Sequence, residues 1–297
     1  MINNKESNIS NKKNINDNSS WDRIIKPKSH STLDTLAETF DYLDLIKFFI
    51  RRDFVAFYKQ TILGPIWFVI QPIINAIVFT FIFGNLANLS TDDSFPFLFY
   101  MSGSVLWSLF SVSLTTNGNL FLQNADLFGK VYFPRLTVVI SNSIMAIVQF
   151  ILQFIIFIFF VIFFYLRGVT INLNYNLVII LPLIIIYISF ISASFGLIIS
   201  SITSKYRDLS FVLSFGIQLW MFASPVVYPM SILSQKYQLL MAFNPIALPI
   251  EIFRKIIFNN NQIQLSFLLI NIIISLFIFL LGIYFFNKVE KKFIDTV

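Results

Sequence analysis

Residues 44–72 read DLIKFFIRRDFVAFYKQTILGPIWFVIQP and decide the fold, because an amphipathic helix passes there directly into an apolar span. At about 100° per residue, bulky apolar side chains gather on one side, opposite Asp44, Lys47 and Arg51. The apolar side holds Tyr42, Leu43, Ile46, Phe49, Ile50, Phe54 and Phe57. This pattern is typical of a helix lying in a membrane interface. Asp53 is an exception, since it falls on the apolar side.

Gly64 and Pro65 follow this helix and are expected to break it. The chain is then apolar from Ile66 to Gly84, which is long enough to cross a bilayer. A basic, aromatic flank before a first span is also common in membrane proteins of many kinds, so this stretch alone names no function.

The composition fixes the class of the protein. Of 297 residues, 57% are hydrophobic and 12% are charged, and the mean hydropathy is +0.77. These values predict an all-α polytopic membrane protein, because a soluble domain needs more charge on its surface. The absence of cysteine excludes disulfides, thiolate metal sites and thiol nucleophiles. His30, the single histidine, falls in a polar segment and is expected to be solvated.

Six stretches without charge follow one another along the chain, and each can supply the roughly 20 residues of a transmembrane helix. The expected spans are residues 66–84, 97–117, 136–165, 177–202, 209–227 and 265–286. Around this transmembrane domain, residues 63–287, we expect a disordered or extended N-terminus (1–31), a cytoplasmic interface helix region (32–62) and a short tail (288–297).

The placement of Lys and Arg predicts the orientation. With a cytoplasmic N-terminus, the inner segments hold every Lys and Arg except Arg167, Lys236, Arg254 and Lys255. Six spans then bring both termini to the cytoplasm.

The segment 228–264 is too apolar for an ordinary loop, and Pro229, Pro245 and Pro249 break it. Short apolar helices of this kind are candidates for re-entrant segments on the outer side. Glu251, Arg254 and Lys255 lie at positions i, i+3 and i+4, so they share a helix face and can pair. Two interpretations stay open: an outer surface helix, or an external gate formed by Asn244, Pro245, Glu251 and Arg254.

No catalytic or metal-binding motif occurs, and the expected spans contain no ionisable Asp, Glu, His, Lys or Arg. Ion-coupled carriers usually need such groups inside the membrane. The sequence therefore argues against an ion-coupled carrier and leaves a channel or a permease driven by another subunit. Asp92 and Asp93 have no further metal ligand in their loop.

Aromatic and amide side chains at membrane depth have two possible roles. The default is packing, interfacial anchoring and hydrogen bonding between helices. The alternative is a passage for sugars, since rings stack on the apolar faces of pyranoses. The candidates for lining such a passage are Trp67, Gln71, Asn75, Trp107, Trp220, Phe222 and Tyr228.

Two predicted cytoplasmic loops, 124–135 (NADLFGKVYFPR) and 204–208 (SKYRD), mix cations with aromatics and suggest docking elements. Each is equally compatible with an ordinary positive-inside turn.

Several short motifs, in this order, resemble the membrane subunit of bacterial ABC exporters for cell-surface polysaccharides, the family of O-antigen, teichoic acid and capsule permeases. They are Arg52-Asp53, YKQT at 58–61, LGPIW at 63–67, Gln71-Pro72, KVYFPR at 130–135, YRD at 206–208, WMFASPVVYP at 220–229, Asn244-Pro245 and EKKF at 290–293. The resemblance extends from about Trp21 to the end. The lead-in at 21–27 is most similar to the Gram-negative O-antigen branch.

The resemblance implies a homodimer in the bacterial inner membrane, paired with two copies of a separate ATPase that binds ATP and Mg²⁺. This chain would then carry no catalytic residue, cofactor or metal and bind no nucleic acid. The interface helix and the two loops would contact the ATPase, and segment 228–264 would form external re-entrant helices. The coupling residues implied are Asp126, Leu127, Phe128, Lys130, Tyr132, Pro134, Arg135, Lys205, Tyr206, Arg207 and Asp208.

The cargo implied is a glycan on a polyprenyl pyrophosphate lipid. From their charge and expected depth, we expect Arg51, Arg52 and Lys59 to attract that pyrophosphate. Two alternatives differ in class: an exporter of a drug or small amphiphilic lipid with the same architecture, and a membrane glycosyltransferase. The second needs acidic or metal-binding loop residues, and this sequence offers few.

Overall fold

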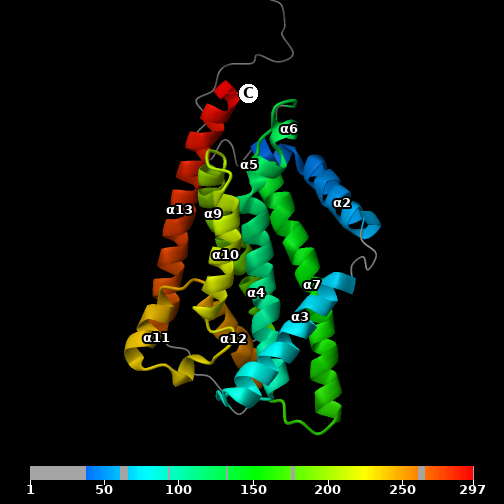
Figure 1. The fold of residues 1–297 in the computed structure, drawn as a ribbon, viewed down its shortest axis with the longest axis vertical. Coiled ribbons are helices and arrows are strands. Elements are labelled where there is room, and N and C mark those ends of the chain that lie inside the picture. The colour runs from blue at the N-terminus through cyan, green and yellow to red at the C-terminus, as the bar shows by residue number, and fades with distance from the viewer. Residues whose placement is uncertain are drawn as a thin grey trace, which may run out of the picture.

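The computed structural model describes residues 38–60, 66–92, 94–131, 133–174, 178–259 and 265–296, and within these ranges all regular structure is helical (Figure 1). The elements are α2 (Leu43–Gln60), α3 (Ile66–Phe79), the π-helix η1 (Thr80–Leu86), α4 (Pro96–Gly118), α5 (Leu120–Gln123), α6 (Ala125–Phe128), α7 (Leu136–Leu166), α9 (Leu181–Thr203), α10 (Leu209–Phe222), the 3₁₀-helix η2 (Met230–Ile232), α11 (Gln235–Ala242), α12 (Ala247–Phe258) and α13 (Leu265–Thr296).

Five of these helical stretches are long and apolar enough to cross a membrane. They are Ile66–Leu86, Pro96–Gly118, Leu136–Leu166, Leu181–Thr203 and Phe267–Val289. The predicted all-α polytopic class is therefore confirmed, and five of the six expected spans correspond to these helices within a few residues.

The fifth expected span, 209–227, is helical only as far as Phe222. Helix α10 has 14 residues and ends at Phe222, so it is about 21 Å long, against about 30 Å of hydrocarbon. The chain turns directly afterwards, where Pro225 has no N–H to continue a helix. Asn244 stabilises the turn: its Nδ2 donates to the Ser224 hydroxyl at 2.9 Å, and its Oδ1 accepts from the Trp220 indole at 3.3 Å.

Helix α4 is the centre of the bundle. It is buried through most of its length and packs against α3, α7, α9, α10 and α12. Small residues allow this close packing. At Gly196 of α9, for example, an added Cβ would lie 2.4 Å from the Cβ of Asn117. The outer helices α3, α7 and α13 are much less buried, since only 22% of the residues in the most apolar window of each span are buried, as expected of surfaces that meet lipid or a second copy.

The two ends of the bundle carry different elements. In Figure 1, α2, α5, α6 and the C-terminal end of α13 lie toward one end, and η1, α11 and α12 toward the other. The hydroxyl of Thr203, the last residue of α9, donates to the carbonyl of Gly118, the last residue of α4, at 2.7 Å. The turn 204–208 therefore lies at the same end as α5 and α6.

Helix α2 does not present its whole apolar side to lipid, as its pattern alone suggested. Ile46 and Phe49 are buried, and α2 packs against α7. The Phe49 ring lies 5.8 Å from the ring of Phe133. Leu43 and Phe54, on the same side, are exposed. The apolar side is thus divided between the bundle and the surroundings.

Candidate coupling and transport sites

An aromatic cluster stabilises the turn between α4 and α7. The guanidinium of the buried Arg135 lies 5.7 Å from the ring centroid of Phe121 and 5.3 Å from that of Phe128. The Phe128 ring is also 5.8 Å from that of Phe133, which in turn contacts Phe49 of α2. These cation–π and ring contacts make α2, α5 and α6 one packed unit at this end of the bundle.

The residues expected to couple to an ATPase divide into two groups by burial. Phe128, Pro134 and Arg135 are buried, and Leu127 is partly buried. The exposed ones are Asp126, Lys130, Lys205, Tyr206, Arg207 and Asp208. The first group supports the turn from within, whereas the second offers a surface to a partner. Tyr132 lies outside the described residues.

The three cations of α2 expected to meet pyrophosphate, Arg51, Arg52 and Lys59, are all exposed. Arg52, however, is already engaged: its Nε is 2.7 Å from the carboxylate of Asp53, and its guanidinium lies 4.8 Å from the ring centroid of Phe49. The charge of Arg52 is therefore largely compensated within α2 itself.

A cavity of about 300 Å³ opens between α2, α4, α5 and α7. Its lining includes Arg52, Asp53, Val112, Thr116, Gln123, Asn124, Asn142, Met145, Ala146 and Gln149. Sequence reasoning missed this cavity, although it had one signal: Asp53 interrupts the apolar side of α2, and the structure places it in the cavity wall. Asn142 and Gln149 come from α7, about 90 residues after Asp53, so no local sequence pattern could predict that the three residues line one cavity.

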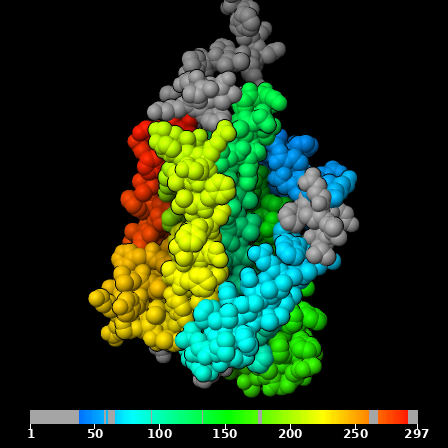
Figure 2. Space-filling view, in the orientation of Figure 1, coloured from blue at the N-terminus to red at the C-terminus, as the bar shows by residue number. Residues whose placement is uncertain are grey.

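The side chains expected to line a passage do not form one surface within this chain. Trp107 is buried against Phe110, with 5.3 Å between ring centroids. Trp220 is partly buried and packs edge to face on Phe110, at 5.1 Å. Tyr228 is partly buried, as is Asn75. Trp67 and Gln71 of α3 and Phe222 of α10 are exposed, and Figure 2 shows α3 and α10 on the same face of the molecule, with α4 visible between them.

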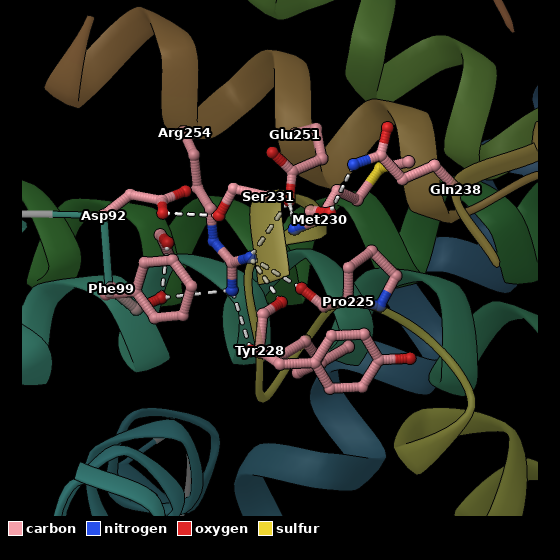
Figure 3. A network of polar contacts seen from close by, with 11 residues as sticks. Asp92, Phe99, Pro225, Tyr228, Met230, Ser231, Gln238, Glu251 and Arg254 are labelled. Atoms are coloured by element: carbon pink, nitrogen blue, oxygen red, sulfur yellow. Dashed lines mark hydrogen bonds and ion pairs between the residues drawn. The ribbon is translucent and has the colours of Figure 1, made fainter. Parts of the chain in front are cut away.

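The segment after α10 is held by one buried cation, Arg254 of α12 (Figure 3). Its guanidinium donates to the carbonyls of Pro225 at 2.6 Å and Val226 at 2.7 Å, with longer contacts to those of Tyr228 and Phe99 at 3.4 and 3.5 Å. It also lies 3.6 Å from the centroid of the Phe99 ring. Arg254 therefore joins α12, the turn after α10 and α4.

Glu251 completes this network. The predicted pairing is confirmed: the Arg254 Nη1 lies 3.5 Å from the Glu251 Oε1, which accepts the N–H of Met230 at 3.2 Å.

Helix α12, which carries both charges, is not among the candidate spans. Burial raises the pKa of the Glu251 carboxyl, which the positive charge of Arg254 opposes, and burial lowers the pKa of Arg254 to about 10. Both directions mean that loss of hydration outweighs the attraction between the two charges.

A second contact joins the loop before α4 to the same region, because the Ser231 hydroxyl donates to Asp92 at 2.5 Å. Gly103 of α4 makes room for the network, since an added Cβ would lie 2.8 Å from both the Arg254 Nη2 and the Val226 carbonyl. Sequence spacing predicted the pair of charges. It could not predict that backbone carbonyls are the main partners of the arginine.

Of the other residues expected at an outer gate, Pro245 is buried and Asn244 holds the end of α10 in place. Asn244, Arg254 and Glu251 all contact the end of α10 or the segment directly after it.

Comparisons with known proteins agree with this architecture. The family model described as ABC-2 type transporter matches residues 44–258. Two O-antigen export system permease proteins RfbA from Klebsiella pneumoniae are 27% and 25% identical, each over 86% of this chain and 95% of the relative. The RfbA protein of Myxococcus xanthus is 25% identical over 70% of this chain and 78% of the relative.

Proposed function

Because the chain belongs to the ABC-2 type transporter family, it is the membrane permease subunit of an ABC exporter, and we propose that its cargo is a lipid-linked polysaccharide of the O-antigen kind. One observation carries this proposal: nearly the full length of two O-antigen export permeases aligns with this chain. The permease itself is a transport component that works with a partner ATPase, which in our proposal binds the ATP and Mg²⁺.

In the proposed assembly, two copies of this chain meet two copies of a cytoplasmic ATPase in the bacterial inner membrane, with both termini in the cytoplasm. Helix α10 supports the dimer, because its side chains Phe211 and Phe215 are 82% and 62% exposed. Such a continuous apolar surface fits a second copy or lipid. Helix α10 and the turn after it would together make the sixth crossing.

Transport would follow from a change of packing between two states of the assembly. The exposed residues Lys130 and Arg207 lie at the end of the bundle that would face the ATPase. The buried Arg135 cluster would carry their displacement to α2 and α7. At the opposite end, the Arg254 network would keep α12 and the end of α10 together, so the passage would open along α3 and α10.

The test is the location of the glycan after removal of the permease from its host. We expect lipid-linked glycan to accumulate in the inner leaflet and surface glycan to be lost, with recovery on expression of the wild-type chain. Recovery should fail when the partner ATPase carries an inactivated nucleotide site. Normal surface glycan together with an altered sensitivity to drugs or small amphiphiles would contradict the proposal and favour the other exporter class.

A further inference from the structure

The cavity between α2, α4, α5 and α7 has the chemistry of a sugar site. Its volume, about 300 Å³, is at the lower end of the range for small-molecule sites. Most of its lining side chains are polar although apolar helices surround it. Gln123 is exposed and Asn142 and Gln149 are partly buried, so a ligand that enters the cavity can reach their amide groups.

Two amides of the lining have their full hydrogen-bonding capacity available. Among the described residues, the side chains of Gln123 and Gln149 have no hydrogen-bond partner, so each offers two N–H donors and one acceptor. Asn142 is fixed instead, since its Nδ2 donates to the Oδ1 of Asn117 at 3.2 Å. That bond leaves the Asn142 Oδ1 to accept. The wall thus combines donors with acceptors, as hydroxyl groups require.

The charges of the lining argue against a phosphate in this cavity. The two charged side chains in the described lining are Arg52 and Asp53, which neutralise each other at 2.7 Å. A phosphate would lose its hydration without gaining an uncompensated cation, and it would meet the Asp53 carboxylate. A neutral, hydroxyl-rich ring has no such penalty. The exposed cations Arg51 and Lys59 lie outside the lining, on the same helix, where a phosphate would remain hydrated.

We propose that this cavity is a recognition subsite for the sugar closest to the lipid pyrophosphate, with Gln123 and Gln149 as its specificity-determining residues. The inference rests on the proposed function, because it assumes a lipid-linked glycan as cargo. The pyrophosphate would stay near Arg51 at the membrane surface, and the first sugar ring would enter between α2 and α7. Asp53 and Arg52 would contribute a planar acceptor and donor pair at the rim.

The test is binding to the purified permease–ATPase complex, measured by native mass spectrometry. The probes are a polyprenyl pyrophosphate without sugar and the same lipid carrying one hexose, one N-acetylhexosamine or one 6-deoxyhexose. We expect the wild type to bind at least one sugar-bearing probe about tenfold more tightly than the bare lipid. The double variant Gln123→Leu, Gln149→Leu should bind the bare and the sugar-bearing lipid with equal affinity. A roughly tenfold preference corresponds to about 1.4 kcal/mol, which is the contribution of the one to two hydrogen bonds that the variant removes.

A matched control is Arg51→Gln, which should weaken the bare and sugar-bearing lipids by the same factor and leave their ratio unchanged. An unchanged thermal unfolding midpoint of the double variant would show that it is folded. The subsite is refuted if the wild type prefers no sugar-bearing probe. It is also refuted if the double variant weakens binding of the bare lipid by the same factor as binding of the sugar-bearing lipid. The glycan localisation experiment reports separately on the cargo, so a correct function with a wrong subsite is distinguishable.

Discussion

At the scale of single residues, Arg254 explains how a full charge is kept in an almost entirely apolar surrounding. Its partners are mainly backbone carbonyls at the turn after α10, where the chain leaves its helix and its C=O groups need donors. Glu251 is the weaker partner, at 3.5 Å. The arginine therefore acts as a cap for that turn more than as half of an ion pair.

This view predicts unequal effects of the two charges. Arg254→Met should lower the free energy of unfolding by roughly 3–5 kcal/mol, because it leaves several buried carbonyls and the Glu251 carboxylate without their donor. Glu251→Gln should cost about 1 kcal/mol or less, since the amide oxygen still accepts the Met230 N–H. Thermal unfolding of the detergent-purified chain measures both. Equal losses would show that the ion pair, and not the capping of carbonyls, dominates.

The raised pKa of Glu251 predicts a pH dependence. In the folded protein the carboxyl holds its proton above its ordinary pKa of 4.5. Its contribution to stability is therefore full below that value and is lost as the pH rises through the raised pKa. Between pH 5 and pH 8, the unfolding midpoint of Glu251→Gln should rise relative to that of the wild type, because glutamine does not titrate. A difference that is the same at both pH values would contradict the assignment.

At the scale of elements, the turn between α4 and α7 has some side chains that are buried in the bundle and others that are exposed. Arg135 and the phenylalanine rings around it hold α5 and α6 against α2, whereas Lys130 in the same turn is exposed and forms no ion pair among the described residues. A loop that looked uniform in sequence thus contains buried side chains that support it and exposed side chains that would contact the ATPase in the proposed assembly. The two groups of side chains differ only in burial, and their burial depends on how α2 packs against the bundle.

The division predicts two kinds of coupling defect. Lys130→Met should abolish most of the ATPase stimulation by the permease while leaving the unfolding midpoint unchanged, because it removes an exposed side chain of this turn. Arg135→Met should lower both, with a loss of stability of about 2 kcal/mol for its desolvated cation–π contacts. ATPase assays and thermal unfolding of reconstituted complexes measure the pair. Normal stimulation by both variants would remove this turn from the coupling path.

At the scale of the whole molecule, α3 and α10 expose many large apolar side chains, and the two helices lie on the same face of the molecule (Figure 2). Helix α4, which carries much of the core, lies between them and is itself buried. A short, apolar α10 cannot cross the bilayer alone, so its exposed face gains most from a second protein surface. In the proposed dimer, α10 would therefore form the contact between the two copies.

The chain has no cysteine, which permits a direct test. A single Phe215→Cys, on the exposed face of α10, should give a disulfide-linked dimer on mild oxidation in native membranes. Ile273→Cys is a matched control, because it is equally exposed, at 66%, but lies on α13. It should remain monomeric on denaturing gels. Cross-linking of Ile273→Cys and none of Phe215→Cys would place the interface on α13 instead.

The sequence by itself determined the class of the protein, five of its long helices and the pairing of Glu251 with Arg254. These features depend on local properties: runs of apolar residues as long as the bilayer is thick, and residues three apart on one helix face. The sequence also showed that Asp53, a charged residue, falls on the apolar side of α2. Local patterns are visible without knowing how the helices pack.

The tertiary structure alone decided where α10 ends, which of the residues expected to couple to an ATPase are buried, and that Asp53 lines a cavity. The end of α10 depends on Asn244, and the turn after it on Arg254, both from later segments, and the cavity combines side chains from three regions of the chain. Whether a polar side chain in a membrane protein is exposed, buried or part of a site depends on the helices packed around it. That packing is a property of the whole bundle, so no window of sequence contains it.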